Sequence, residues 1–173
     1  METDVLIMEN EKTAVAQSVT NQPDGPGKRI GKRGELTMIG NVLPGGAEIF
    51  RKRLPQFQAE AAYWEGRVGT VQDFRILLFD NDTRFLLLLV YDGDFKPYLN
   101  DITTQASEWL DAVATDVLEG YPGLKNPGAA EWVMSLMHPA EFFYVGTPNS
   151  TVRDVLKMEK MSQALSNLLD AAN

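Results

Sequence analysis

The sequence predicts an α+β fold built on an antiparallel sheet, from two observations. Residues 84–101 begin with an apolar run, Phe85 to Tyr91, which breaks at Asp92-Gly93-Asp94 and continues in a helical pattern. A second strand-like segment, Val71 to Phe79, precedes it and ends in the apolar run Ile76 to Phe79; the four residues between the two runs (80–83) are good turn formers. The two runs therefore predict a β-hairpin that leads directly into a helix.

The remaining elements follow from apolar periodicity and from Gly, Pro and capping residues. In chain order we first expect a strand over 35–43, a helix over 47–64 that is kinked or broken at Pro55, and the hairpin strands 71–79 and 84–91. A helix should follow from an Asp94 cap to Gly120, and then a short helix over 129–137. A fourth strand over 141–146 and a last helix starting at Ser150 or Thr151 complete the chain. This order is that of the ferredoxin-like split βαβ unit, a four-stranded antiparallel sheet with helices on one face.

The chain is long enough for one domain with its own core. Residues 1–33 are polar and rich in Gly and Pro towards their end, and they show no period. Such a composition is typical of a flexible arm, which a partner subunit could hold. We therefore expect a flexible N-terminal arm over 1–33 and a ferredoxin-like domain over 34–173.

The segments Ile76 to Phe79 and Phe85 to Tyr91 are apolar on both faces of the predicted hairpin, whereas an antiparallel sheet with one wet face alternates apolar and polar residues. Helices on one side would leave the other side as a large exposed apolar patch. The simplest cover is the same face of a second copy, which predicts a sheet-to-sheet homodimer. The alternative is that the last helix or the N-terminal arm folds back over this face.

Composition excludes several classes of function. The chain has no cysteine, which excludes disulfides, thiol nucleophiles and cysteine-bound metals. Its net charge of −8 argues against nucleic-acid binding. No signal peptide and no apolar run long enough to span a membrane are visible. We expect a cytoplasmic protein with no nucleic-acid or membrane partner.

The pattern resembles the dimeric α+β-barrel superfamily, and within it an uncharacterised bacterial branch. The resemblance covers roughly residues 35–170 and lies in three places: the first strand running into Pro44-Gly45 and a helix, the segment Tyr91-Asp92-Gly93-Asp94 with Tyr98-Leu99 following, and Phe143-Tyr144-Val145-Gly146 before Thr151-Val152. It implies two ferredoxin-like subunits stacked sheet on sheet.

The superfamily includes dye-decolourising peroxidases, chlorite dismutases, antibiotic-biosynthesis monooxygenases and small stress-response proteins, so it does not select one activity. The G-x-x-D-G motif of the peroxidases is absent, because Leu89 stands three residues before Asp92. This departure weakens the peroxidase interpretation.

Few residues point to chemistry. His138, the only histidine, is a weak candidate for a haem ligand or general base, or else a surface residue at a helix end. Asp92 and Asp94 could bind a metal but suit a turn and a helix cap better. Arg75, a charge inside an apolar strand, could hold an anionic ligand or form an ion pair at the sheet edge or dimer rim.

Large aromatic side chains lie on elements expected to meet between sheet and helices. They could line a cavity for a flat organic ligand or simply form core. The candidates are Tyr91, Tyr98, Trp109 and Tyr144, with Trp64 beside them. With Arg75, the first four are the predicted ligand-binding residues.

The sequence thus predicts a homodimer that binds a small organic molecule in a pocket between sheet and helices, with no cofactor. One alternative is an enzyme of the same fold, either a cofactor-free monooxygenase or isomerase, or a haem-dependent peroxidase-like enzyme that uses His138. The other is a structural interaction module whose partner binds the N-terminal arm.

Overall fold

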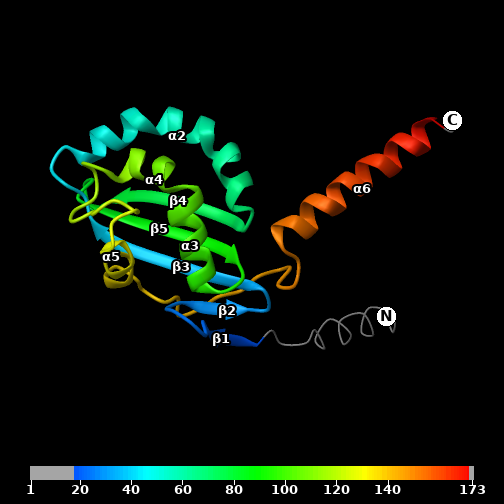
Figure 1. Ribbon diagram of the computed structural model, residues 1–173, viewed down its shortest axis with the longest axis horizontal. Coiled ribbons are helices and arrows are strands. Elements are labelled where there is room, and N and C mark those ends of the chain that lie inside the picture. Colours follow the sequence, from blue (N-terminus) through cyan, green and yellow to red (C-terminus); the bar gives the residue numbers. More distant parts are fainter. Residues whose placement is uncertain (1–17, 172–173) are drawn as a thin grey trace, which may run out of the picture.

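The computed structural model describes residues 18–171, which form an α+β structure with a five-stranded antiparallel sheet (Figure 1). The strands are β1 (Val19–Asn21), β2 (Lys28–Ile30), β3 (Arg33–Asn41), β4 (Val71–Phe79) and β5 (Arg84–Asp92), in the spatial order β1-β2-β3-β5-β4. The helices of these residues are α2 (Gly46–Val68), α3 (Phe95–Gln105), α4 (Ser107–Ala114), α5 (Ala129–Ser135) and α6 (Val152–Ala171). The predicted α+β class is confirmed, but the sheet has five strands rather than four.

The predicted hairpin is confirmed as β4 and β5, which pair along their length around a turn at residues 80–83. Asp80, Asn81 and Asp82 all have positive φ, between 52° and 67°. Asp and Asn tolerate this left-handed conformation better than other residues that carry a Cβ. The turn composition that predicted the hairpin is therefore also what allows its tight geometry.

Strand pairing divides the apolar residues of β5 between two faces. Leu87 and Leu89 lie opposite Met38 and Leu36 of β3, and all four point towards the helices. The residues that alternate with them point to the other side, which we call the outer face. It includes Leu86, Leu88 and Val90 of β5, Arg75 and Leu77 of β4, and Thr37 and Ile39 of β3. The continuous apolar run of β5 therefore supplies two different surfaces.

Helix α2 is longer than predicted and runs through Pro55 without a break in its assignment. Proline lacks the N–H that would bond one turn back, and it bends helices for that reason. Figure 1 shows α2 as an arc over α4 and the sheet rather than a straight rod. The helix ends at Gly69, which has positive φ and donates its N–H to the carbonyl of Glu65. Instead of the expected kink or break at Pro55, the helix curves gradually along its length.

The single helix predicted from Asp94 to Gly120 is instead two helices, α3 and α4, separated at Ala106. Ala106 has a φ of −131°, outside the helical range, although its N–H still bonds the carbonyl of Ile102. The predicted inward stripe survives this break and is buried throughout. It consists of Tyr98, Ile102, Ala106, Trp109, Val113 and Val117.

The cap of α3 also differs from the prediction. Asp94 occupies the N-cap position but makes no side-chain cap bond; its carboxylate pairs with Arg29 of β2 instead. The N–H groups of Phe95 and Lys96, which have no partner within the helix, donate to Asp24 in the loop between β1 and β2 at 2.9 Å each. A carboxylate distant in sequence therefore supplies the cap.

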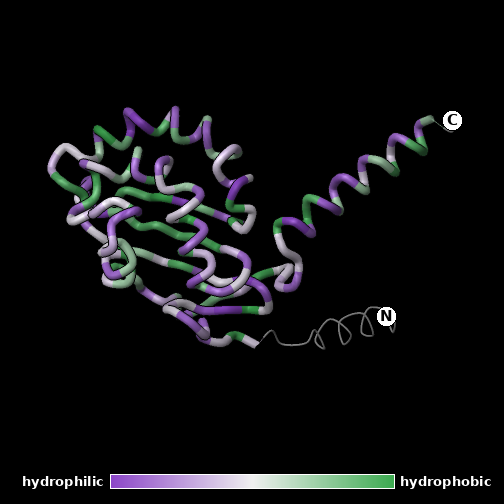
Figure 2. The backbone as a smooth tube through the Cα atoms, viewed as in Figure 1, coloured by the Kyte–Doolittle hydropathy of each residue, from purple (hydrophilic) through white to green (hydrophobic). Residues whose placement is uncertain are grey.

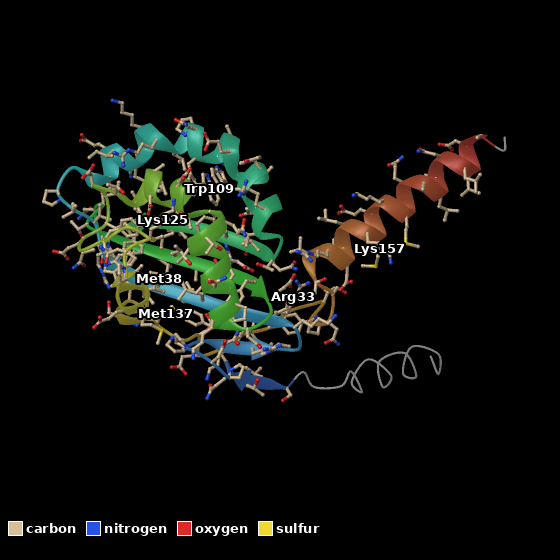
Figure 3. All side chains as sticks on the ribbon, in the orientation of Figure 1. Arg33, Met38, Trp109, Lys125, Met137 and Lys157 are labelled. Atoms are coloured by element: carbon tan, nitrogen blue, oxygen red, sulfur yellow. The ribbon has the colours of Figure 1, made fainter. Side chains whose placement is uncertain are left out.

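The predicted fourth strand over 141–146 is wrong, because these residues adopt no strand. The edge of β3 is occupied elsewhere: β2 pairs with Gly34 and Arg33, and Met137 forms a bridge with Met38. Figure 3 shows these two methionines side by side. Residues 136–138 thus take the fourth-strand position, and no edge of β3 remains for 141–146.

Half of the predicted N-terminal arm, residues 1–17, lies outside the described residues. The other half, residues 18–33, has defined structure, since β1 and β2 form a hairpin that extends the sheet beyond β3. Gln22 of this hairpin is buried and donates to the hydroxyl of Tyr91 at 3.0 Å. These residues therefore pack as part of the domain in the structure.

Helix α6 begins where the sequence predicts and then projects away from the sheet (Figure 1). A reciprocal cap starts it: Thr151 Oγ1 accepts from the Asp154 N–H, and the Asp154 carboxylate accepts from the Thr151 N–H. None of its described side chains is buried. Figure 2 shows apolar and polar segments alternating along it. Within residues 18–171, no helix is both long and apolar enough to cross a membrane.

A buried ion pair joins β3, β4, β5 and the start of α6. The guanidinium of Arg33 donates to Asp92, directly opposite on β5, and both side chains are almost fully buried. The Asp92 carboxylate also accepts from the Gln72 side chain at 2.9 Å and from the Val152 N–H at 2.7 Å. Figure 3 places Arg33 at this end of the sheet, beside the start of α6.

We predict that Asp92→Asn destabilises the protein by about 3–5 kcal/mol, because it leaves the Arg33 charge buried without a counterion. Urea unfolding followed by circular dichroism measures the change. Asp82→Asn is the matched control: Asp82 also binds an arginine, Arg51, but on an exposed surface. Equal unfolding midpoints for wild type and Asp92→Asn would contradict the assignment of this pair as a structural anchor.

Candidate functional site

A cavity of about 110 Å³ lies between the inner face of the sheet and helices α2 to α5. Its floor is made by the inward side chains of β3, β4 and β5: Leu36, Met38, Val71, Phe74, Ile76, Leu78, Phe85, Leu87 and Leu89. Its roof comes mainly from α3 and α4, through Tyr98, Leu99, Ile102, Trp109, Leu110 and Val113. The lining is almost wholly apolar, as expected of a site for a small organic ligand.

Trp109 forms a fixed part of this wall. Its ring stacks on Phe57 of α2 with centroids 4.1 Å apart and planes 8° from parallel. Its indole N–H donates to the carbonyl of Phe57 at 2.9 Å, so the polar edge of the ring is satisfied. Figure 3 shows Trp109 beneath the arc of α2. The side chain therefore presents apolar surface to the cavity and no free donor.

At the α5 end of the cavity, the polar groups are also satisfied. The Tyr121 hydroxyl donates to Asp111 at 2.5 Å, and the Trp132 indole donates to the carbonyl of Glu119 at 3.2 Å. Burial, followed by the hydrogen bond to Asp111, raises the pKa of Tyr121. These residues close that end of the cavity and offer a ligand mainly apolar surface.

The opposite end of the cavity contains two polar groups that are not committed to the protein. Glu65, in the last turn of α2, is the only charged residue among the lining residues described. No residue of 18–171 hydrogen bonds to its half-buried carboxyl or forms an ion pair with it. Burial raises the pKa of Glu65. The Tyr98 hydroxyl likewise has no hydrogen-bond partner in this range.

Tyr98 is held in place by Tyr91, which lies behind it. The two rings stack with centroids 4.2 Å apart, and Tyr91 is fully buried. Burial is the main cause that raises the pKa of both phenols; charge interactions with Tyr91 and Glu65 add to it at Tyr98. Both hydroxyls therefore remain protonated at neutral pH. The Gln22 side chain fixes the Tyr91 hydroxyl and leaves its own carbonyl oxygen buried without a partner.

The structure brings together only some of the residues predicted to bind a ligand. Tyr98 and Trp109 line the cavity, and Tyr91 supports Tyr98 from behind. Arg75 lies on the outer face, exposed, in an ion pair with Asp73 at 2.8 Å. Tyr144 lies in the loop between α5 and α6, with 67% of its surface exposed.

His138 is exposed and does not line the cavity. Its backbone N–H donates to the carbonyl of Thr37, which fixes the chain at the edge of β3. The described lining of the cavity therefore contains no imidazole that could ligate a haem iron. Within residues 18–171, no group of three or more His, Asp or Glu side chains could hold a metal ion.

The most informative residue missed from the sequence is Glu65. It follows Ala61 by four residues and precedes Val68 by three, so it lies on the inward edge of the apolar stripe of α2. An acid at such a position is the signal that could have identified it. Comparison of the chain with protein-family models, curated proteins and solved structures found no match.

We predict that the Tyr98 phenol does not ionise while the protein is folded. Tyr98→Phe should leave the alkaline titration of the folded protein, followed by absorbance at 295 nm, unchanged. The raised pKa of Tyr98 means that the folded state holds this proton more tightly than the unfolded state does. The resulting stability is complete below about pH 10, the unfolded-state pKa of tyrosine, and is lost at higher pH.

The free energy of unfolding should accordingly fall less steeply between pH 9 and 11 in Tyr98→Phe than in wild type. Urea titrations at each pH measure this slope. A lost absorbance step in the folded Tyr98→Phe variant would show instead that the Tyr98 hydroxyl is accessible to hydroxide.

Proposed function

We propose that the protein binds a small organic molecule in the cavity between the sheet and the helices. The observation that carries this proposal is the cavity of about 110 Å³, apolar over most of its lining and with uncommitted polar groups at one end. An engineered protein cavity of ~150 Å³ with similar lining binds benzene. A ligand of single-ring size, or a short alkyl chain, therefore suits this space.

The cost of leaving the cavity empty supports the same proposal. The cavity opens partly to solvent, and lining side chains such as Ile76 and Leu87 are only half-buried, so apolar surface stays in contact with water when it is empty. The neighbouring core is well packed, with Phe85 and Val117 almost wholly buried. An apolar ligand in the cavity would remove this remaining apolar surface from water, which is favourable.

The topology supports a ferredoxin-like unit, related to the dimeric α+β-barrel superfamily that the sequence resembles. Strands β3, β4 and β5, with α2 and the α3–α4 pair as connections, follow the order of the split βαβ unit. In this proposal the segment around Met137 is a shortened fourth strand beside β3. The hairpin β1–β2 is then an addition at the same edge.

The outer face supports the proposal of a sheet-to-sheet homodimer. Leu86, Leu88 and Val90 of β5 are only half-buried there, and Leu77 of β4 is 45% exposed. The loop after α5 lies against the β3 side of this face, where the Thr147 carbonyl accepts from Arg33. A second copy placed with the same face inward would cover these leucines across a two-fold axis.

We predict that Ile76→Trp prevents binding of toluene, because a larger side chain on the cavity floor fills the space. Ile76 lies on the edge strand β4, which can adjust to a larger ring more easily than a central strand. Arg75→Trp is the matched control, since it adds the same ring one residue away on the outer face. Chemical-shift changes in a two-dimensional NMR titration measure binding. Toluene binding to Ile76→Trp with wild-type affinity would contradict the proposed site.

The dimer proposal has a separate test in Leu88→Arg. Leu88 lies on the outer face, between Thr37 and Arg75 of the flanking strands. An arginine there would place two like charges in a two-fold interface, so the variant should be monomeric in solution. Light scattering coupled to size-exclusion chromatography measures its mass. Tyr63→Arg, on the exposed side of α2, should keep the wild-type mass. A soluble, folded Leu88→Arg protein with unchanged mass would overturn the sheet-to-sheet arrangement.

A further inference from the structure

The polar side chains that line the cavity are of two kinds: those that hydrogen bond to the protein and those that do not. The indole and phenol groups of Trp109, Tyr121 and Trp132 all donate to protein oxygens. Among the polar lining side chains described, only the Glu65 carboxyl and the Tyr98 hydroxyl form no hydrogen bond with the protein. Both lie at the same end, close enough that the Glu65 charge acts on the Tyr98 phenol.

We propose that the cavity binds a hydrophobic amine, with its ammonium group on the Glu65 carboxylate and its apolar body on the strand leucines and Trp109. This inference rests on the proposed function and adds the chemical class of the ligand. The Tyr98 hydroxyl is placed to accept a second hydrogen bond from the same ammonium group.

Neither Arg67, two residues along the chain from Glu65, nor Arg153, which lies near the end of α2 in space, neutralises the Glu65 carboxyl. The Arg67 guanidinium lies against the rings of Tyr63 and Trp64 and donates to the Tyr63 hydroxyl at 3.2 Å. The Arg153 guanidinium lies beside Gly69, and no ion pair joins it to Glu65. The carboxyl is thus partly removed from water without a counterion from residues 18–171, which is an unfavourable arrangement for the protein alone.

The negative charge of Glu65 argues against a carboxylic acid as the ligand. A carboxylic acid would bring a second negative charge next to Glu65, in a protein whose net charge is already −8. A neutral alcohol could hydrogen bond to Glu65 but would not balance its charge. An ammonium group does both, and charge-assisted hydrogen bonds are roughly twice as strong as neutral ones. The amine should therefore bind more tightly than an alcohol of the same shape.

The test uses four single-ring probes that differ only in their polar group: benzylamine, benzyl alcohol, toluene and benzoate. Each is titrated into the full-length protein at pH 7.5 by NMR, where a primary amine is charged. We expect benzylamine to bind about tenfold more tightly than benzyl alcohol, as a charge-assisted bond in place of a neutral one implies. Toluene should bind more weakly, and benzoate should not bind.

The variant Glu65→Gln keeps the shape of the side chain and removes its charge. It should lose the roughly tenfold preference for benzylamine over benzyl alcohol. Glu48→Gln is the matched control, because Glu48 is an exposed acid in the first turn of the same helix. It should leave all four affinities unchanged.

The outcomes separate the two proposals. Binding of toluene and benzyl alcohol without a preference for benzylamine would overturn the amine assignment and leave the apolar site intact. An equal loss of benzylamine affinity in Glu48→Gln would also overturn it, because the attraction would then come from net charge. Failure of all four probes to bind would overturn both proposals. The ligand series on the wild-type protein decides the question even if Glu65→Gln does not fold.

Discussion

The arrangement of the sheet depends on a buried carboxylate, that of Asp92. It accepts hydrogen bonds from Arg33 of β3, from Gln72 of β4 and from the first N–H of α6. A buried carboxylate is stable only when its charge and its lone pairs are both matched. The three donors meet that requirement together, and in doing so they fix three strands and the origin of α6 at one point. Helix α6 leaves the molecule from this point, which explains how an element with no buried side chain has a defined start.

Asp92 helps to fix the register of β5 against β3, and this register determines on which face of the sheet each leucine of β5 lies. Pairing of Arg33 with Asp92 places Leu36 opposite Leu89 and Thr37 opposite Leu88. A shift by one residue would exchange the faces, because side chains alternate along a strand. The cavity floor and the outer face are therefore alternate residues of the same strands. A ligand inside and a second copy outside are compatible, since they contact different side chains.

The sequence predicted the elements whose signals are local. The apolar runs and the turn at residues 80–83 predicted the hairpin, and the spacing from Tyr98 to Val117 predicted the buried stripe. It missed features that depend on competition between distant segments. Residues 141–146 have strand composition, but β2 and Met137 occupy the edge of β3 that they would need. Asp94 has the sequence of a cap, yet Asp24 takes that role because the β1–β2 hairpin brings it there.

The candidate site was predictable to a similar degree. Aromatic composition pointed to Tyr98 and Trp109, which do line the cavity. Arg75 was predicted to bind a ligand because it is a charged residue in an apolar strand. Side chains alternate between the two faces along β4, however, and this places Arg75 on the outer face, where it pairs with Asp73. Which face of a strand meets the helices could not be read when both faces are apolar. Glu65 was harder to identify from the sequence. A single acid at the edge of the apolar stripe of a helix looks like the ordinary boundary between the apolar and polar sides of that helix.

Glu65 is also a residue that the fold itself does not require. It occupies the last turn of α2, where the helix dipole is negative and a carboxylate is unfavourable. It is partly buried, and no ion pair with residues 18–171 offsets that cost. Glutamine or leucine would serve the helix better at this position. Residues that break local rules without a structural gain are expected at functional sites. The negative end of α2 and the carboxylate add their potentials at one end of an apolar cavity, and a cationic group on an apolar ligand is the complement of both.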